Sequence, residues 1–525
     1  MSTNFQFCFH DYEATGLNPR RDRPTQFAAI RTDADLNEIG EPINLFCKPL
    51  PDMVPHVEAC MVTGISPQHC EKHGIPEYQF ADEINRALGA PGTIGVGFNT
   101  IKFDDEFTRN LLWRNLADPY AREWKNGCGR WDIVDLVRVA YALRPEGIVW
   151  PKREDGEPTF KLEDLARANG IAHDSAHDAL SDVRATIALA RLIRNSNRRL
   201  FDYCLALHRK DAVAAQIGFG KKQPFIHVSG VNAKERGCLS ILYPIAMSDT
   251  NKNEFICWDL LEDPDALLTA DGAQVKATMF KRTHELAEGE VKLPLRTIAT
   301  NKSPMVFQDM RVLSAERAAL FGVDPQLAMA NMAKLQAVMT KRDVPALLRE
   351  IYRREEKVQD PEDDLYGAFV SSPDRAKLDA VRALFADSPT MLAQKIGRDE
   401  IVFGDARLTE LVFRFRARHA PQTLTKEEAA RWADFACGKI VKGRGDHHTA
   451  GALIVSLHEK ERTTNGAHTT FLQGLMDYAW GRLTAFSGPD HSLPEFSPLV
   501  GSDVVDDHDA DPAVAAGRAE CAASV

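Results

Sequence analysis

The sequence contains no long apolar run, no paired cysteine motif and no internal repeat. Because it lacks the run of about 18 apolar residues that a membrane-spanning helix needs, we expect no membrane partner. The first residues, MSTNFQFCFHDYE, have neither a basic segment nor a long apolar one, which argues against a secretory signal. The ten cysteines form no C-x-x-C pair, which argues against a zinc ribbon or a disulfide framework. These absences predict a cytoplasmic protein with reduced thiols.

An excess of positive charge is also lacking, because 75 acidic residues outnumber 64 basic ones and the net charge of the 525 residues is −11. Nucleic-acid-binding proteins usually carry a basic footprint. The distribution of charge weakens this objection: residues 486–525 hold eight acidic side chains against one arginine, whereas residues 199–350 hold 20 basic and 18 acidic ones. The middle of the chain therefore permits a local basic groove. Residues 486–525, acidic and almost without aromatics, are predicted to be a disordered tail.

Hydrophobic patterns divide the rest of the chain into three zones, each long enough to bury its own core. Residues 1–197 combine strand and helix patterns, which predicts an α/β or α+β layer. Short apolar runs broken by Gly, Pro and Asn predict a small β-rich domain over residues 198–352, ending in helices. Residues 353–485 are mostly helical in pattern. The strands expected in the first zone are FQFCFHDYE, QFAAIRTD, INLFCKP and TIGVGF, and the helices are EFTRNLLWRNL, WDIVDLVRVAYAL, FKLEDLARANG and HDALSDVRATIALARLIR.

Two acids, Asp11 and Glu13, stand on the first expected strand. Residues i and i+2 of a strand point to the same face, so the two carboxylates should project side by side. Like charges this close are costly unless one is protonated or a cation lies between them. Hard cations such as Mg²⁺ or Mn²⁺ take oxygen ligands of this kind. A lone pair of this spacing also occurs at exposed strand ends, where both acids are simply solvated.

Other candidate residues fall at the starts of two expected helices. Asp104 and Asp105 open the helix after TIGVGFNT, where the helix dipole accounts for one acid. His177 precedes the last helix of this zone, and Asp182 lies in its second turn, so the histidine should reach in from the loop. The full combination, D-x-E on a strand, Asp on a middle helix and H-x₄-D on a late helix, is far more specific than any one part of it.

This combination resembles the DEDDh superfamily of 3′→5′ exonucleases, and longer segments resemble the exodeoxyribonuclease I family. The resemblance implies a ribonuclease H-like exonuclease domain with a mixed sheet (1–197), an SH3-like DNA-clamping domain (198–352) and an all-helical C-terminal domain (353–485). It implies a hydrolase that degrades single-stranded DNA to 5′-mononucleotides in repair and recombination. The segments that carry it are HDYEATG, DRPTQFAAIRTD, VTGISPQ, FDDEFTRN, RWDIVDLVRVAYALRPEGIVWP, AHDALSDVRATIALA, HVSG, TNKSP and LYGAFVSSPDR.

The resemblance also assigns catalytic roles. Asp11, Glu13 and Asp182 are expected to bind two Mg²⁺ ions, with Mn²⁺ as a substitute, and Asp104 is expected at the same site. His177 is expected to take the proton from the attacking water, a role that suits an imidazole. Glu13 is also expected to contact the terminal sugar.

Contacts with DNA and with a protein partner are implied at further positions. Lys161 stands where we expect the family to have arginine, which keeps the positive charge but loses the bidentate fork. Arg144 and Tyr203 match a pocket for the single-stranded-DNA-binding protein, although other pocket positions differ. We expect a monomer. The expected DNA contacts are Lys161, Arg109, Tyr120, Trp124, Arg138, Asn253 and Arg296, which offer charge for phosphates and rings for stacking.

Three alternatives remain open. The first is an exonuclease acting on RNA or dinucleotides, against which only the SH3-like resemblance counts. The second is a proofreading subunit of a polymerase, which would need no large appended domains. The third is a catalytically silent scaffold that binds single strands or a protein, a reading that the five filled catalytic positions oppose.

Overall fold

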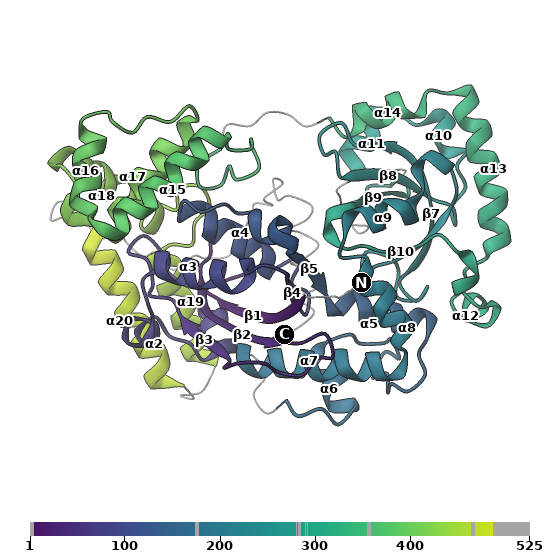
Figure 1. Cartoon of the computed structure of the whole chain (residues 1–525), viewed down its shortest axis with the longest axis horizontal. Helices are drawn as coiled ribbons and strands as arrows, with labels where there is room; N and C mark the ends of the chain where they lie inside the picture. Colours follow the sequence, from purple (N-terminus) through teal and green to yellow (C-terminus); the bar gives the residue numbers. More distant parts are fainter. Residues whose placement is uncertain are drawn as a thin grey trace.

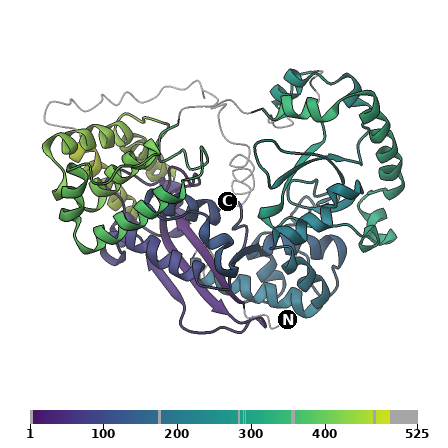
Figure 2. The ribbon, with the colours of Figure 1, turned by 45° about the horizontal axis from the view of Figure 1, so that its top comes forward.

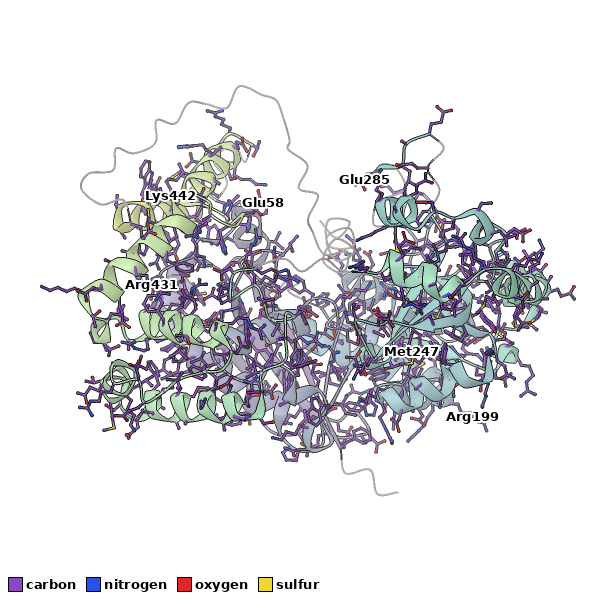
Figure 3. All side chains as sticks on the ribbon, turned by 90° about the horizontal axis from the view of Figure 1, so that it is seen from above. Glu58, Arg199, Met247, Glu285, Arg431 and Lys442 are labelled. Atoms are coloured by element: carbon purple, nitrogen blue, oxygen red, sulfur yellow. The ribbon has the colours of Figure 1, made fainter. Side chains whose placement is uncertain are left out.

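The N-terminal part of the molecule is flanked by the two other parts (Figures 1 and 2). Seen from above, the labelled residues Met247 and Arg431 mark the two flanks (Figure 3). The three-part architecture expected from the sequence is confirmed. The predicted tail, apart from its first residue Phe486, lies outside the described residues. The computed structural model describes residues 5–173, 178–279, 281, 285–288, 290, 292–353, 359–463 and 468–486.

The first sheet is mixed, with the strand order β3-β2-β1-β4-β5. Its central strand β1 pairs antiparallel with β2 on one side and parallel with β4 on the other. All four strands expected from the sequence are present, and β5 was not expected because its sequence merges with the helix that follows. The strands are β1 (Gln6–Ala14), β2 (Pro24–Thr32), β3 (Ile43–Phe46), β4 (Thr93–Gly97) and β5 (Gly129–Asp132).

Seven α-helices accompany this sheet among the described residues. The last four agree with the sequence prediction to within a few residues. The first three were not predicted, since helices α1 and α2 are only 7 residues long and carry too little periodicity. The helices are α1 (Val57–Thr63), α2 (Pro67–His73), α3 (Glu77–Gly89), α4 (Asp104–Arg114), α5 (Ile133–Leu143), α6 (Leu162–Ala168) and α7 (Ala179–Ser196), with the short 3₁₀ turns η1 (Ala121–Glu123) and η2 (Lys125–Gly127).

The two faces of β1 serve different cores. Phe7 and Phe9 are fully buried in the core that includes α7, whereas Tyr12 packs in a second core with α3 on the opposite face. Because side chains alternate along a strand, Asp11 and Glu13 share the face of Phe7 and Phe9. The apolar part of β1 therefore determines on which face of the sheet its two acids lie.

The second sheet is antiparallel throughout, with the order β10-β6-β7-β8-β9. The expected β-rich character of this zone is present, and the two helices that open it were not expected. The strands are β6 (Phe225–Val228), β7 (Leu239–Met247), β8 (Glu254–Asp259), β9 (Leu295–Ala299) and β10 (Met305–Phe307). The helices are α8 (Arg198–Ala206), α9 (Lys210–Ile217), α10 (Ala266–Thr269), α11 (Gly272–Met279), α12 (Ala315–Leu320), α13 (Pro325–Lys341) and α14 (Val344–Ile351), with 3₁₀ turns η3 (Phe219–Lys221), η5 (Thr300–Lys302) and η6 (Met310–Val312).

The first two parts do not have separate cores, which differs from the expectation. One continuous apolar core includes β1, β4, α5 and α7 together with β6–β10 and α14. The rings of Trp131 and Phe201 meet edge to face inside it, 5.1 Å apart. At its border the Arg130 guanidinium donates to the Asn301 carbonyl at 2.7 Å, and the Ser303 hydroxyl donates to the Arg130 carbonyl at 2.8 Å. The exonuclease sheet and the SH3-like sheet therefore form one packed unit.

The C-terminal part is helical, as expected, and is joined to the first part by buried ion pairs. Asp52 accepts from Arg418 at 2.7 Å and from Lys439 at 2.8 Å, with all three side chains buried. The Trp113 indole donates to the Pro361 carbonyl at 2.9 Å. The helices are α15 (Ser372–Asp387), α16 (Pro389–Gly397), α17 (Ala406–His419), α18 (Lys426–Ile440), α19 (Ala450–Thr463) and α20 (Thr469–Phe486), with the 3₁₀ turn η7 (Pro421–Thr423).

None of the described helices combines the length and the apolar character that a membrane crossing requires. The nine cysteines among the described residues are free and buried.

Candidate active site

Three carboxylates converge at the C-terminal end of β1. Asp11 and Glu13 lie beyond the stretch of β1 that pairs with β4, which ends at Phe9, and Asp182 comes from the start of α7, which packs on β1. One oxygen atom from each of the three carboxylates lies within 4.8 Å of the others. Among the described residues, no other group of three His, Cys, Asp or Glu side chains meets this criterion.

Burial and the convergence of negative charge raise the pKa values of Asp11 and Glu13. Burial, with added contributions from the charges of Asp104, Glu13 and Asp182, raises the pKa of Asp11 well above its ordinary value. Burial, followed by Asp182 and Asp104, raises the pKa of Glu13 to about 9. The charged forms of Asp11 and Glu13 are thus destabilised by burial and by neighbouring charges, and a divalent cation bound among the three acids would relieve that repulsion.

Asp104 adjoins the three carboxylates without joining the 4.8 Å group. It is the first residue of α4, is 2% exposed, and accepts a hydrogen bond from the Tyr12 backbone N–H at 3.1 Å. The Tyr12 hydroxyl bonds to the Thr108 hydroxyl at 2.9 Å, one turn further along α4. The start of α4 is therefore fastened to β1 at the residue between Asp11 and Glu13.

Asp105, the neighbouring residue, has a structural role. Its carboxylate accepts from Arg122 at 2.6 Å and from Arg130 at 2.9 Å, and all three side chains are buried. These two guanidiniums hold the pKa of Asp105 well below its ordinary value, against burial. Since Arg130 also bonds to Asn301, the ion pair connects α4 to the SH3-like part.

Asp105→Ala should therefore lower the free energy of unfolding by about 3–5 kcal/mol, because it leaves two buried guanidiniums without their carboxylate. Urea denaturation followed by tryptophan fluorescence measures the change. Asp309→Ala is the control: this exposed acid pairs with the exposed Arg311, and its loss should leave the unfolding midpoint nearly unchanged. Equal midpoints for the two variants would contradict the structural role of Asp105.

A histidine that the sequence prediction did not select lies beside the site. The Nε2 atom of His173 is 2.5 Å from Oδ1 of Asp182, within a short hydrogen bond. His177, the predicted base, lies outside the described residues. The segment AHDSAHD contains both histidines, and spacing alone favoured the second because it matches the H-x₄-D pattern. Asp178, which caps α7 and accepts from Gln26 at 3.2 Å, is a further polar group here that the prediction did not include.

Family models match all three parts of the chain. The model described as "Exonuclease" matches residues 8–190, "Exonuclease I SH3-like domain" matches residues 208–354, and "Exonuclease I C-terminal domain" matches residues 359–481. Exodeoxyribonuclease I of Haemophilus influenzae is 39% identical over 479 residues, which cover 91% of this chain and 99% of that protein. The chain belongs to the exodeoxyribonuclease I family.

Solved structures agree with this membership. Exonuclease I from Methylocaldum szegediense has 39% sequence identity and a TM-score of 0.84, with 91% of this chain and 100% of that chain covered. E. coli exonuclease I in complex with a dA16 oligonucleotide has 35% identity and a TM-score of 0.83, with the same coverage. An E. coli complex with single-stranded DNA in a zinc-bound form and an ExoI/SSB-Ct complex, both at 34% identity, are also similar. As a member of the exodeoxyribonuclease I family with its exonuclease domain, the chain is a hydrolase that depends on a divalent metal ion.

Against this family background, the predicted DNA contacts fall into distinct environments. Arg109 is 4% exposed and makes four hydrogen bonds inside the protein, to Glu123, Glu106 and Tyr366. Its guanidinium also lies over the ring of Tyr120 at 5.5 Å. The two glutamates, which the sequence prediction did not consider, account for this burial. A phosphate contact by Arg109 remains a prediction.

The two most exposed aromatic side chains among the described residues come from different parts of the chain. Trp124 is 68% exposed, and Phe369, which the sequence prediction missed, is 87% exposed. The Phe369 ring meets that of Tyr120 edge to face at 5.7 Å, and Tyr366 lies 6.5 Å from Tyr120. Rings this exposed suit the stacking of unpaired bases. The order of these residues along the chain gives no sign that the two segments meet.

The remaining predicted DNA contacts are spread over the first two parts. Lys161 is half-buried at the start of α6, and Arg138 is buried on α5 with Asp135 at 2.8 Å. Asn253 precedes β8, and its carbonyl accepts from the backbone of Thr300 at 2.7 Å. Arg296 on β9 is half-buried, and its guanidinium donates to the Leu295 carbonyl at 3.1 Å.

The two predicted partner contacts lie at the boundary of the first two parts. The guanidinium of Arg144, at the end of α5, donates to the Val312 carbonyl at 2.9 Å. The Tyr203 hydroxyl on α8 donates to the Val306 carbonyl at 2.8 Å, and its ring stacks on Phe307 at 4.8 Å. Both residues therefore contact the same short segment, residues 306–312.

Proposed function

We propose that this enzyme is a 3′→5′ exonuclease that degrades single-stranded DNA to 5′-mononucleotides in DNA repair and recombination. The observation that carries the proposal is the convergence of Asp11, Glu13 and Asp182 in a domain that matches the exonuclease family model. The related enzymes solved with oligonucleotides support single-stranded DNA as the substrate. We propose the cytoplasm as its place of action.

The residues present fit a pair of Mg²⁺ ions. The three carboxylates supply only oxygen ligands, which hard cations prefer. Burial and mutual repulsion raise the pKa values of Asp11 and Glu13, and a bound cation would relieve the repulsion. We assign Asp11, Glu13 and Asp182 as the ligands, with Asp104 beside them. When bound, two such ions activate a water molecule and stabilise the charge on the phosphate and on the leaving 3′ oxygen.

The chain's own residues supply the remaining chemistry. We assign His177 as the base that takes the proton of the attacking water, the role that the H-x₄-D spacing indicates. His173 bonds to Asp182 and so fixes the orientation of that carboxylate, as ligand-supporting histidines and acids do in other metal sites. Glu13, the least exposed of the three acids, adjoins the position proposed for the terminal sugar.

Selectivity for single strands follows from the kind of contacts available. Unpaired bases can stack on the rings of Trp124, Tyr120 and Phe369. The bases of a duplex are already stacked on each other and are not available for such contacts. We assign contacts with the phosphates and sugars of the strand to Arg296, Lys161, Arg138 and Asn253. We also assign Arg144 and Tyr203 to the binding of the single-stranded-DNA-binding protein, in agreement with the ExoI/SSB-Ct complex of a relative.

Chelation tests the metal dependence and the substrate together. EDTA should abolish release of mononucleotides from an end-labelled single-stranded DNA oligonucleotide, and Mg²⁺ or Mn²⁺ should restore it. A hairpin with a blunt 3′ end and an RNA of the same sequence should be degraded far more slowly. Cleavage that persists in EDTA would contradict the metal site. Equal rates on DNA and RNA would favour the alternative of an exonuclease that acts on RNA.

A further inference from the structure

The strand that carries Asp11 and Glu13 ends in an irregular turn. The register between β1 and β2 shifts between Glu13 and Ala14, immediately after the second acid. Beyond the shift, Thr15 and Arg23 form a reciprocal pair: the Thr15 N–H donates to the Arg23 carbonyl at 2.8 Å, and the Arg23 N–H donates to the Thr15 hydroxyl at 2.9 Å. A bulge of this kind redirects the side chain beside it. The direction of Glu13 therefore depends on how this turn is held.

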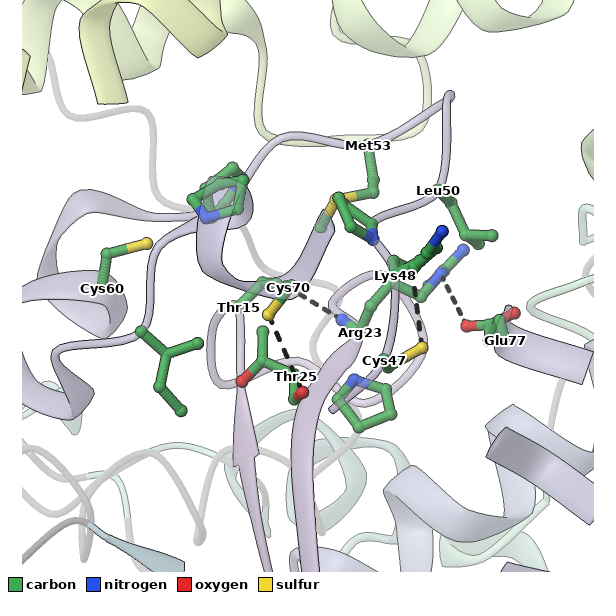
Figure 4. A pocket seen from close by; sticks show the side chains of 15 residues that line it. Thr15, Arg23, Thr25, Cys47, Lys48, Leu50, Met53, Cys60, Cys70 and Glu77 are labelled. Carbon is green, nitrogen blue, oxygen red and sulfur yellow. Dashed lines mark hydrogen bonds and ion pairs between the residues drawn. The ribbon is translucent and has the colours of Figure 1, made fainter. Parts of the chain in front are cut away.

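The side chain of Arg23 holds the turn from inside. It is 3% exposed, and its Nη1 atom donates to the carbonyls of Arg20 at 3.3 Å, Arg21 at 2.9 Å and Asp22 at 3.1 Å. The turn thus wraps around one guanidinium group. Figure 4 shows Arg23 between Thr15 and Glu77, below the loop that carries Met53.

Two glutamates from different parts of the chain compensate the buried charge of Arg23. The Nε atom lies 4.0 Å from Glu77, on α3, and Nη2 lies 3.6 Å from Glu362, which precedes the C-terminal helices. Burial lowers the pKa of Arg23, and both glutamates oppose that effect. Glu362 is in turn ion-paired with Arg418 of α17, whose guanidinium also binds Asp52. A line of buried charges therefore runs from the turn after β1 into the helical C-terminal part.

We propose that Arg23 is a positioning residue for the metal site. It sets the turn that directs Glu13, and through Glu362 it makes that setting depend on the helical C-terminal part. The inference rests on the proposed metal ligands and goes beyond them, because Arg23 contacts none of those carboxylates. A lysine at this position keeps the charge but not the planar fork that reaches three carbonyls and a carboxylate at once.

The test compares the Mg²⁺ concentration that gives half-maximal single-turnover cleavage in Arg23→Gln, Arg23→Lys and the unaltered protein. Both variants should raise this concentration by about 10–100-fold, as the loss of groups that orient metal ligands does elsewhere. The KM for the oligonucleotide should change far less. Rescue by lysine would reduce the role of Arg23 to charge alone and overturn the proposal.

Arg416→Gln is the matched control for a purely structural effect. Arg416 is also buried, pairs with Glu428 at 2.9 Å and donates to the Thr423 carbonyl, but all its partners lie in the C-terminal part. It should lower the melting temperature and leave the Mg²⁺ requirement unchanged. Arg23 variants that melt early but keep the normal Mg²⁺ requirement, as this control does, would overturn the proposal.

Two further variants complete the test. If the Arg23 variants do not fold, Glu362→Gln decides: it should raise the Mg²⁺ requirement in the same direction, and an unchanged requirement refutes the coupling. Asp11→Asn, measured in parallel, distinguishes a failure of the proposed metal site from a failure of the proposed role of Arg23. Normal cleavage by Asp11→Asn refutes the metal site, whereas an inactive Asp11→Asn together with an unchanged Arg23→Gln refutes only the positioning role.

Discussion

Asp11→Asn and Asp182→Asn should each slow cleavage by about 10³-fold or more. The loss of a metal ligand removes several kcal/mol of charge stabilisation from the transition state, and each 1.4 kcal/mol corresponds to about tenfold in rate. Single-turnover digestion of a 5′-labelled oligonucleotide in saturating Mg²⁺ measures the change. Fluorescence anisotropy in EDTA should show nearly normal DNA binding, because the proposed phosphate and base contacts lie elsewhere.

Thermal denaturation supplies an independent readout for the same variants. Without metal, Asp11→Asn should melt at or above the temperature of the unaltered protein, because it removes a buried charge whose neighbours repel it. Mg²⁺ should stabilise the unaltered protein by mass action and the variant far less. Cleavage near the normal rate, or an equal stabilisation of both proteins by Mg²⁺, would exclude Asp11 as a ligand.

The double variant Trp124→Ala/Phe369→Ala should lose processivity on long single strands while still cleaving short oligonucleotides. Each base that stacks on a ring contributes about 1–3 kcal/mol, so the loss of two rings should speed dissociation of the strand by about 30-fold or more. A trap experiment measures this: with excess unlabelled DNA added after the first turnovers, the unaltered protein should finish its strand and the variant should stop early.

Trp480→Ala provides the control for the loss of an exposed ring. Trp480 is 36% exposed on α20, a helix that packs on α2, α18 and α19. After the trap DNA is added, the Trp480→Ala variant should degrade its bound strand as far as the unaltered protein does. If the double variant also degrades its strand to the end in the presence of the trap, the exposed rings do not hold the strand, and the proposed stacking by Trp124 and Phe369 is wrong.

The convergence of Asp11, Glu13 and Asp182 could be predicted from the sequence because the constraint on each residue is local. Asp11 and Glu13 need only the two-residue repeat of a strand, and Asp182 needs only its place at a helix start. Asp104 and Asp105 could not be told apart in this way. What separates them is Arg122 and Arg130, distant in sequence from both, which bind one acid and leave the other beside the site.

The sequence says less where long-range packing decides the environment of a side chain. Arg109 was chosen because arginines bind phosphate, and nothing in the sequence indicates that Glu106 and Glu123 enclose its guanidinium. Phe369 was overlooked because an isolated Phe in a loop pattern gives no sign of its exposure. Strand β5 was not predicted because Asp132 both ends that strand and caps α5. The sequence pattern of the strand therefore passes without a break into that of the helix.

The shared core also sets a condition on how the protein is made. The strands of the exonuclease sheet and α7 are complete at Ser196, but the core that covers them includes residues as late as β10, which ends at Phe307. At a synthesis rate of about 5–20 residues per second, the ribosome needs on the order of 10 s to supply that remainder. During this interval the nascent exonuclease domain exposes apolar surface around Trp131 and Phe201. Chaperones or the ribosome surface must cover it, and a chain interrupted between the two points should aggregate instead of acting as a small nuclease.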